Sequence, residues 1–131
     1  MAELALRGPK ELFFGSGIRR QLGSQAVLLG SHALLCCGRT ALKRSGALDE
    51  LTALLADKGV AVTVFAEVEA EPSLDTVERG RAAYQAQACD LVVAVGGGSA
   101  LDVGKAIAAL ASHPEPMSHW FAGAEISGQG A

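Results

Sequence analysis

The feature that most constrains the fold is a run of three consecutive glycines inside the stretch VVAVGGGSALDVGKAIAAL, residues 92–110. The apolar residues before the glycines predict a buried β-strand, and the spacing of the apolar residues after them predicts a helix. Each glycine costs backbone entropy on folding, so three in succession indicate sharp chain geometry or a closely approaching partner. The glycine run is therefore expected at a strand-to-helix junction.

The rest of the chain continues this alternation of strands and helices. In chain order we expect a short helix at 18–25, a strand at 32–38, a short and a longer helix between 40 and 59, a strand at 60–65, a helix starting near Ser73, a strand at 91–95 and a helix at 99–112. Such an order over short connections is typical of right-handed βαβ crossovers. The predicted fold class is α/β, a Rossmann-like parallel sheet with helices on both faces and a βαβαβα core at 32–112.

The two ends of the chain differ from this core. Two apolar runs, 2–6 and 11–14, flank a Gly-Pro pair and predict a strand hairpin within residues 1–15. Residues 113–131 contain turn-forming and small residues and are expected to form a loop, with no fourth core strand. We therefore expect residues 1–131 to be a single domain, or the N-terminal portion of one that is incomplete at its C-terminus.

Composition excludes several classes of function. The net charge is −3 and basic residues form no block, so a nucleic-acid partner is not expected. Charged residues interrupt the N-terminal apolar runs, and no run is long enough to span a bilayer, so neither a signal peptide nor a membrane partner is expected. The odd set Cys36, Cys37 and Cys89 suggests buried thiols in a reducing compartment. The expected location is the cytoplasm.

The glycine run lies where open α/β sheets bind ligands, beyond the carboxyl end of a strand. Gly96, Gly97 and Gly98 lack Cβ atoms, so a diphosphate can approach their backbone N–H groups. The following helix adds its unpaired first-turn donors and the positive end of its dipole. Ser99 is expected to cap this helix and to donate its hydroxyl to a phosphate. The alternative is a mere tight turn, in which Ser99 and Asp102 form a capping box.

Helical spacing places Ser99, Asp102 and Lys105 on one side of the helix. Beside a phosphate loop, Asp102 is placed to accept a hydrogen bond from a ribose or amide of the same ligand. The alternative is that Asp102 and Lys105 form only a solvated ion pair.

The stretch GGGSALDVGK (96–105) fits the pattern G-G-G-S-x-x-D-x-x-K, and with it the chain resembles the N-terminal nucleotide-binding domain of the iron-dependent alcohol dehydrogenase family. The stretches FFGSG, LLCCGRT, AEPSLDTV and ACDLVVAVGGGS agree with that family in order and spacing. The resemblance extends from about Phe13 to about Leu110. It implies a domain that binds NAD or NADP, and a separate helical domain that holds iron or another divalent metal through one Asp and three His.

The resemblance also implies roles for individual residues. Gly97, Gly98 and Ser99 would hold the pyrophosphate, and Asp102 would face the nicotinamide ribose. The full set of expected cofactor-binding residues is Gly38, Arg39, Gly96, Gly97, Gly98, Ser99, Asp102 and Lys105.

Position 38 matches the place where NAD-preferring relatives carry an Asp that binds the adenosine ribose. Here Gly38 removes the carboxylate and Arg39 adds a guanidinium, which favours NADP over NAD. The alternative is that Arg39 points to solvent and discriminates little.

The chain's histidines, His32, His113 and His119, lack the spacing of a metal site, so we expect no metal-binding and no catalytic residue here. The metal-binding C-terminal domain is expected to be absent from this chain. The implied function is an NAD(P)-dependent alcohol dehydrogenase that interconverts alcohols and aldehydes or ketones by hydride transfer, with this part inactive alone.

Three alternatives stay open: a non-catalytic dinucleotide- or phosphate-binding module, a structural α/β fragment, and an oxidoreductase like maleylacetate reductase or glycerol dehydrogenase. The expected partners are a dinucleotide, a small alcohol or carbonyl substrate of the full-length enzyme, and a second copy in a homodimer.

Overall fold

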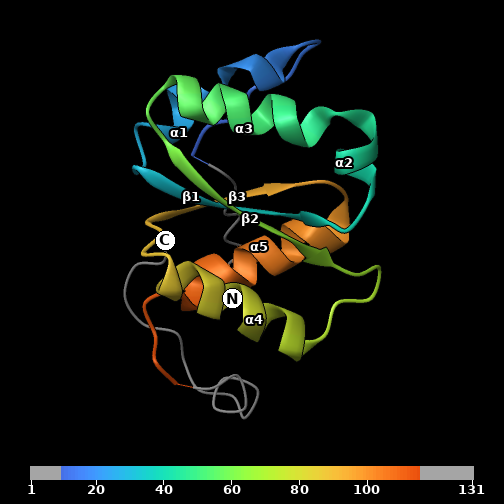
Figure 1. The fold of residues 1–131 in the computed structure, drawn as a ribbon, viewed down its shortest axis with the longest axis vertical. Coiled ribbons are helices and arrows are strands. Elements are labelled where there is room, and N and C mark those ends of the chain that lie inside the picture. The colour runs from blue at the N-terminus through green and yellow to red at the C-terminus, as the bar shows by residue number, and fades with distance from the viewer. Residues whose placement is uncertain (1–9, 116–131) are drawn as a thin grey trace, which may run out of the picture.

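The structure, a computed structural model, describes residues 10–115 and contains one parallel sheet between two helical layers (Figure 1). The strands are β1 (His32–Gly38), β2 (Ala61–Val68) and β3 (Leu91–Val95), in the order β2-β1-β3. The helices are η1 (Ile18–Gln21, a 3-10 helix), α1 (Leu22–Ala26), α2 (Ala41–Ser45), α3 (Ala47–Asp57), α4 (Leu74–Ala86) and α5 (Gly98–Leu110). The predicted α/β class is confirmed.

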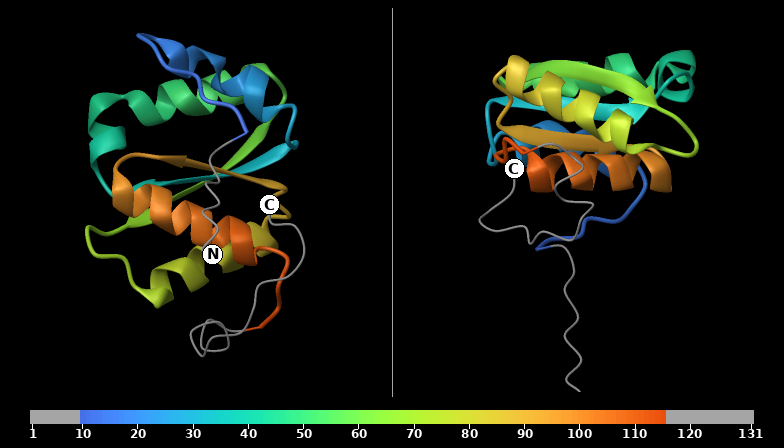
Figure 2. Two further views of the ribbon diagram at one scale, coloured as in Figure 1. Left: turned by 180° about the vertical axis from the view of Figure 1, so that it is seen from behind. Right: turned by 90° about the horizontal axis from the view of Figure 1, so that it is seen from below.

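The sheet order explains why helices cover both faces. The chain moves from β1 outward to β2 and then returns across β1 to reach β3. Because parallel crossovers share one hand, this reversal places α3 on one face and α4 on the other. Figures 1 and 2 show α1, α2 and α3 on one side of the sheet and α4 and α5 on the other. The reversal lies between β1 and β3, where a doubly wound sheet opens a crevice.

The central strand β1 is buried on both faces. Leu35 and Cys37 pack against the side covered by α3, whereas Leu34 and Cys36 pack against the side covered by α4 and α5. Residues 33–37 are all fully buried, which accounts for their unbroken apolar sequence. The cysteines Cys36, Cys37 and Cys89 are free and buried, as expected.

Strand β2 is longer than predicted. It continues to Val68, whereas the sequence pattern suggested an end at Phe65. Both residues are buried, but the exposed Glu67 between them interrupts the apolar pattern. A register shift between Cys36 and Gly38 lets Gly38 pair with Val68, so β1 and β2 end side by side.

Of the expected N-terminal hairpin, the structure describes only the second half. Residues 11–14 form no strand, and the first half of the hairpin lies outside the described residues. Leu12 and Phe14 are 81% and 97% exposed, so they gain no burial from the described part of the sheet that would favour a strand. Most of the loop expected at 113–131 also lies outside the described residues. Within residues 10–115, no helix has the length and apolarity needed to cross a bilayer.

Candidate dinucleotide-binding site

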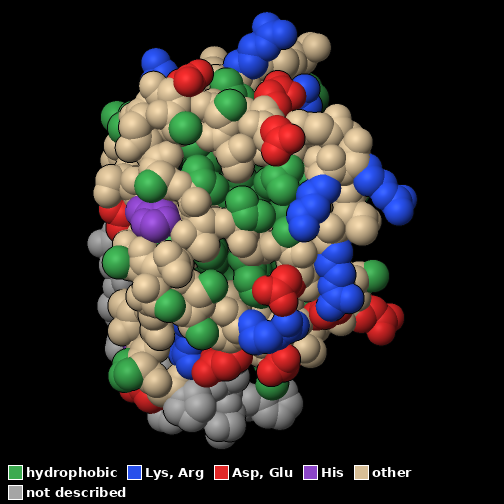
Figure 3. Space-filling view, viewed as in Figure 1, with side chains coloured by type: hydrophobic (Ala, Val, Ile, Leu, Met, Phe, Trp, Pro, Cys, Tyr) green, Lys and Arg blue, Asp and Glu red, His purple; other side chains and the backbone are tan. Residues whose placement is uncertain are grey.

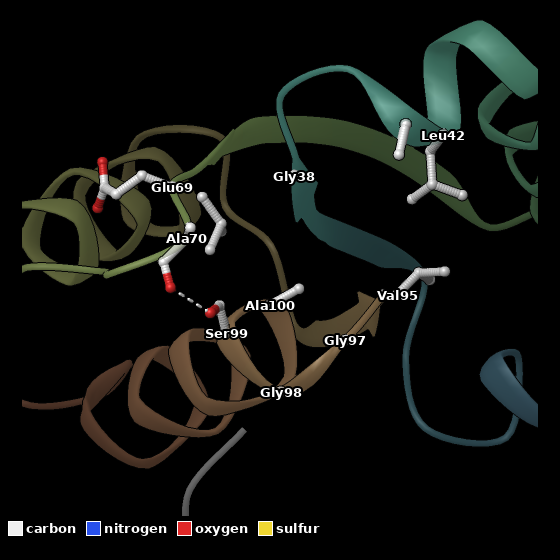
Figure 4. Close-up of a pocket in the computed structure, with 12 residues that line it drawn as sticks. Gly38, Leu42, Glu69, Ala70, Val95, Gly97, Gly98, Ser99 and Ala100 are labelled. Carbon is white, nitrogen blue, oxygen red and sulfur yellow. Dashed lines mark hydrogen bonds between the residues drawn. The ribbon is translucent and has the colours of Figure 1, made fainter.

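The carboxyl ends of all three strands meet at a pocket of about 230 Å³ (Figure 4). Its walls are formed by Gly38, Ala41, Leu42, Val68, Glu69, Ala70, Val95, Gly96, Gly97, Gly98, Ser99 and Ala100. Pockets for drug-sized ligands typically measure roughly 300–1,000 Å³. The pocket is therefore large enough for a group the size of a diphosphate.

The three glycines of the loop have different structural needs. Gly96 has a φ of +137°, which side chains rarely allow. By contrast, Gly97 and Gly98 lie outside the left-handed region, and a Cβ at either position would meet no atom of residues 10–115 within 4 Å. Neither packing nor backbone conformation in the described residues requires glycine there. A bare loop surface beside an open pocket fits a ligand whose phosphates approach the backbone closely.

Helix α5 begins one residue earlier than predicted. Its N-cap is Gly97, which is extended and offers no side-chain cap, and the helix starts at Gly98. The prediction that Ser99 caps the helix is wrong, and so is the alternative capping box with Asp102. Because no side chain among the described residues caps α5, its first-turn N–H groups remain available to an anion.

Ser99 instead connects two walls of the pocket. Its hydroxyl donates a hydrogen bond of 2.7 Å to the carbonyl oxygen of Ala70, as Figure 4 shows. Ala70 follows β2 and Ser99 lies in the first turn of α5, so the bond spans the ends of two non-adjacent strands. This bond fixes the loop after β2 against the start of α5.

Gly38 and Arg39 lie at the end of β1. Among the described residues, a Cβ at Gly38 would meet only the carbonyl oxygen of Val68, at an ordinary 3.7 Å, so their packing does not require glycine there. Arg39 does not line the pocket but pairs with Glu69, which does; its Nη2 lies 3.4 Å from Oε2 of Glu69. The expected freedom of Arg39 to meet a phosphate is thus limited by a carboxylate.

The sequence pattern did not indicate Glu69. Its Oε1 accepts hydrogen bonds from the Thr76 hydroxyl and, at 3.2 Å, from the Ser73 N–H. These bonds, that from Thr76 first, together with the charge of Arg39 hold the pKa of Glu69 below its usual value. Glu69 is therefore a carboxylate at neutral pH. An acidic residue near the end of a predicted strand was the one available signal.

Asp102 and Lys105 are not gathered into this pocket. Asp102 lines a second hollow with Pro72, Ser73, Leu74, Val77 and Val103, where α4 begins beside α5. Lys105 is exposed on the next turn of α5, and among the described residues no ion pair joins it to Asp102. The structure thus brings together five predicted residues, namely Gly38, Gly96, Gly97, Gly98 and Ser99.

Gly104 is a further residue that positions the site. A Cβ there would lie 2.5 Å from the Cβ of Ala94, so glycine is needed for α5 to pack directly on β3. The signal in the sequence was a glycine on the apolar side of an alanine-rich helix. Through this contact Gly104 sets where the N-terminal donors of α5 lie relative to the strand ends.

Iron does not fit the described residues. In residues 10–115, no group of three or more His, Cys, Asp or Glu side chains is arranged to hold a metal ion. His119, one of the three histidines, lies outside that range.

Comparison with known proteins identifies the family of the chain. The family model for iron-containing alcohol dehydrogenases matches residues 9–129. A probable NADH-dependent butanol dehydrogenase 2 of Bacillus subtilis (strain 168) is 38% identical over 109 residues, which cover 83% of this chain and 28% of that protein. An NADPH-dependent butanol dehydrogenase of Clostridium saccharobutylicum is 34% identical over 107 residues, covering 82% of this chain and 27% of that protein.

Solved structures show the same likeness. An iron-containing alcohol dehydrogenase from Thermotoga maritima superposes with a TM-score of 0.83 at 32% identity, over 95% of this chain and 35% of that one. The chain spans less than a third of the length of the curated relatives it matches. The chain belongs to the iron-containing alcohol dehydrogenase family.

Proposed function

We propose that this chain is the NAD(P)-binding part of an alcohol dehydrogenase that interconverts alcohols and aldehydes or ketones by hydride transfer. One observation carries the proposal: Gly97 and Gly98 line a pocket at the ends of three parallel strands, although no contact within the described chain requires glycine there. The family, whose members here include butanol and 1,3-propanediol dehydrogenases, supplies the reaction class. When bound, the nicotinamide ring accepts or delivers the hydride.

The residues of this chain would bind and orient the dinucleotide. The backbone N–H groups of residues 97–99 would donate to the pyrophosphate, and the positive end of the α5 dipole would offset its charge. The Ser99–Ala70 hydrogen bond would keep the pocket walls in register. We assign Asp102 to the nicotinamide ribose because it lies one turn further along α5 from Ser99. We also assign Lys105, one turn beyond Asp102, to cofactor binding.

We further propose that NADP is preferred to NAD. Gly38 carries no carboxylate to repel a 2′-phosphate, and the Arg39 guanidinium presents donors suited to a phosphate. The relatives include proteins named as NADH-dependent and one named as NADPH-dependent, so family membership alone does not decide the preference.

The phosphate-loop assignment is tested with Gly98→Val. The added side chain would occupy the space in which the diphosphate approaches the backbone, so NADPH affinity should fall more than tenfold, since each lost hydrogen bond to a charged group contributes roughly 1.5–3 kcal/mol. Affinity is measured by titrating NADPH fluorescence, and circular dichroism checks that helix and strand content is unchanged.

Ala56→Val is the matched control, because Ala56 is exposed on α3, outside the pocket. This variant should bind NADPH like the original chain. A folded Gly98→Val variant that keeps full affinity would refute the phosphate-loop assignment.

A further inference from the structure

The Arg39–Glu69 ion pair occupies the rim of the proposed nucleotide pocket. Arg39 follows β1 and Glu69 follows β2, and the pairing of Gly38 with Val68 brings the two side chains to the same edge of the sheet. The side chains are 61% and 29% exposed, and their nearest N–O distance is 3.4 Å. Figure 3 shows that acidic and basic side chains are interspersed on the right of the viewed face, where Figure 1 places the ends of β1 and β2. The site therefore carries a positive charge that a negative charge already compensates.

The two members of the pair are held very differently. The Glu69 carboxylate is anchored through Oε1 by the Thr76 hydroxyl and the N–H of Ser73, the N-cap of α4. In Figure 4 this carboxylate is directed away from the glycine loop. Within the described residues, Arg39 has one hydrogen bond, to Oε2 of Glu69. Arg39 can thus leave Glu69, whereas Glu69 stays in place.

We infer that Glu69 is a positioning residue that weakens the preference for NADPH over NADH by competing with the 2′-phosphate for the guanidinium of Arg39. The inference rests on the proposed function. A phosphate monoester carries about −1.5 to −2 charges at neutral pH, so it attracts Arg39 and is repelled by a fixed carboxylate nearby. NADH lacks this phosphate, so Glu69 affects its binding little. Glu69 thereby reduces the discrimination between NADPH and NADH that Gly38 and Arg39 would otherwise supply.

The test compares the dissociation constants of NADPH and NADH for the chain and three variants, Glu69→Gln, Arg39→Gln and the double variant. Gln keeps an oxygen that can accept from Thr76 and Ser73 but removes the charge. Exposed ion pairs contribute little to binding free energy, so the gain in affinity is limited. We expect Glu69→Gln to tighten NADPH binding by only roughly three- to tenfold at low salt. NADH affinity should change less than about twofold, and in the Arg39→Gln background the gain for NADPH should disappear.

Glu67→Gln is the matched control, since Glu67 is an exposed carboxylate near the end of β2, two residues before Glu69; it pairs with Arg79 and does not line the pocket. It should leave the NADPH-to-NADH ratio unchanged. An unchanged ratio in Glu69→Gln, weaker NADPH binding, or equal loss of both nucleotides, as a purely structural role at the start of α4 would give, overturns the inference while leaving the proposed function intact. No saturable binding of either nucleotide to the original chain overturns the proposed function, and this inference with it.

Discussion

The contact between α5 and β3 predicts whether adding a methyl group at Gly104 raises or lowers the stability of the chain. Gly104 is buried, and a Cβ added there would lie 2.5 Å from the Cβ of Ala94. Ordinary contact between two such carbons begins near 3.4 Å, so Gly104→Ala must push α5 and β3 apart by about 1 Å locally. The strand ends and the donors of α5 would then no longer keep their present spacing.

Two opposing effects set the magnitude. Replacing glycine by alanine inside a helix stabilises a protein by roughly 0.5–1 kcal/mol, because the unfolded chain loses conformational freedom. Overpacking of a close helix–strand contact destabilises it by roughly 1–3 kcal/mol. We therefore expect Gly104→Ala to lower the free energy of unfolding by about 1–2 kcal/mol and to weaken NADPH binding several-fold.

Urea unfolding followed by circular dichroism measures the stability, and NADPH titration measures the binding. A second variant, Ala94→Gly, removes the atom that the new methyl group would meet. Combined with Gly104→Ala, it should restore stability by about 1 kcal/mol beyond the sum of the two single effects, because the residues are in contact. If Gly104→Ala stabilises the chain, or if the two effects simply add, α5 does not pack on β3 as described.

Three further predictions concern single side chains. Gly38→Asp should reduce the NADPH-to-NADH affinity ratio by about tenfold, as competitive titrations would show, since a carboxylate repels the 2′-phosphate; an unmoved ratio would contradict the assignment. Asp90 accepts the N–H groups of His32 and Ser31 at 2.8 and 2.9 Å, and these bonds lower its pKa. The stability it contributes is therefore present above its usual value of 3.8 and is lost as the pH falls. Asp90→Asn should destabilise the chain by about 1 kcal/mol at pH 7, and urea unfolding should show this difference shrinking as the pH is lowered below 3.8. Burial raises the pKa of the Cys36 thiol to about 12, so Cys36 should react with a disulfide reagent at pH 8 only after unfolding; rapid reaction in the folded chain would argue against its burial.

The strands were predictable to different extents for a physical reason. Strand β1 lies in the middle of the sheet and is apolar at every buried position, so its limits follow from the sequence alone. Strand β2 lies at an edge of the sheet and has an exposed polar residue, Glu67, near its end. Because Glu67 interrupts the apolar pattern, the sequence did not indicate the last three residues of the strand, up to Val68. Edge strands are in general less distinct than central ones in a single sequence.

The start of α5 is a feature that the local sequence pattern did not predict correctly. Ser99 has the chemistry of an N-cap, but the helix begins one residue before it, after Gly97. The hydroxyl of Ser99 is instead bonded to Ala70, which lies 29 residues away along the chain. The sequence near Ser99 contains no information on that acceptor, because it depends on how β2 and α5 are placed by the fold.

Some features of the pocket depend on the local sequence, and others depend on the fold. The bare surfaces of Gly97 and Gly98 were predictable, because the absence of a side chain is a local property of the sequence. The environment of Arg39 was not, because its partner Glu69 follows a different strand and meets it only through the β1–β2 register. The local sequence thus predicts the bare loop surface to which we assign the diphosphate, whereas the sheet order decides which charges lie beside the end of β1. If the chain binds NAD(P) as proposed, cofactor preference depends on two strand ends together, and the effect of a substitution at position 38 or 39 depends on Glu69.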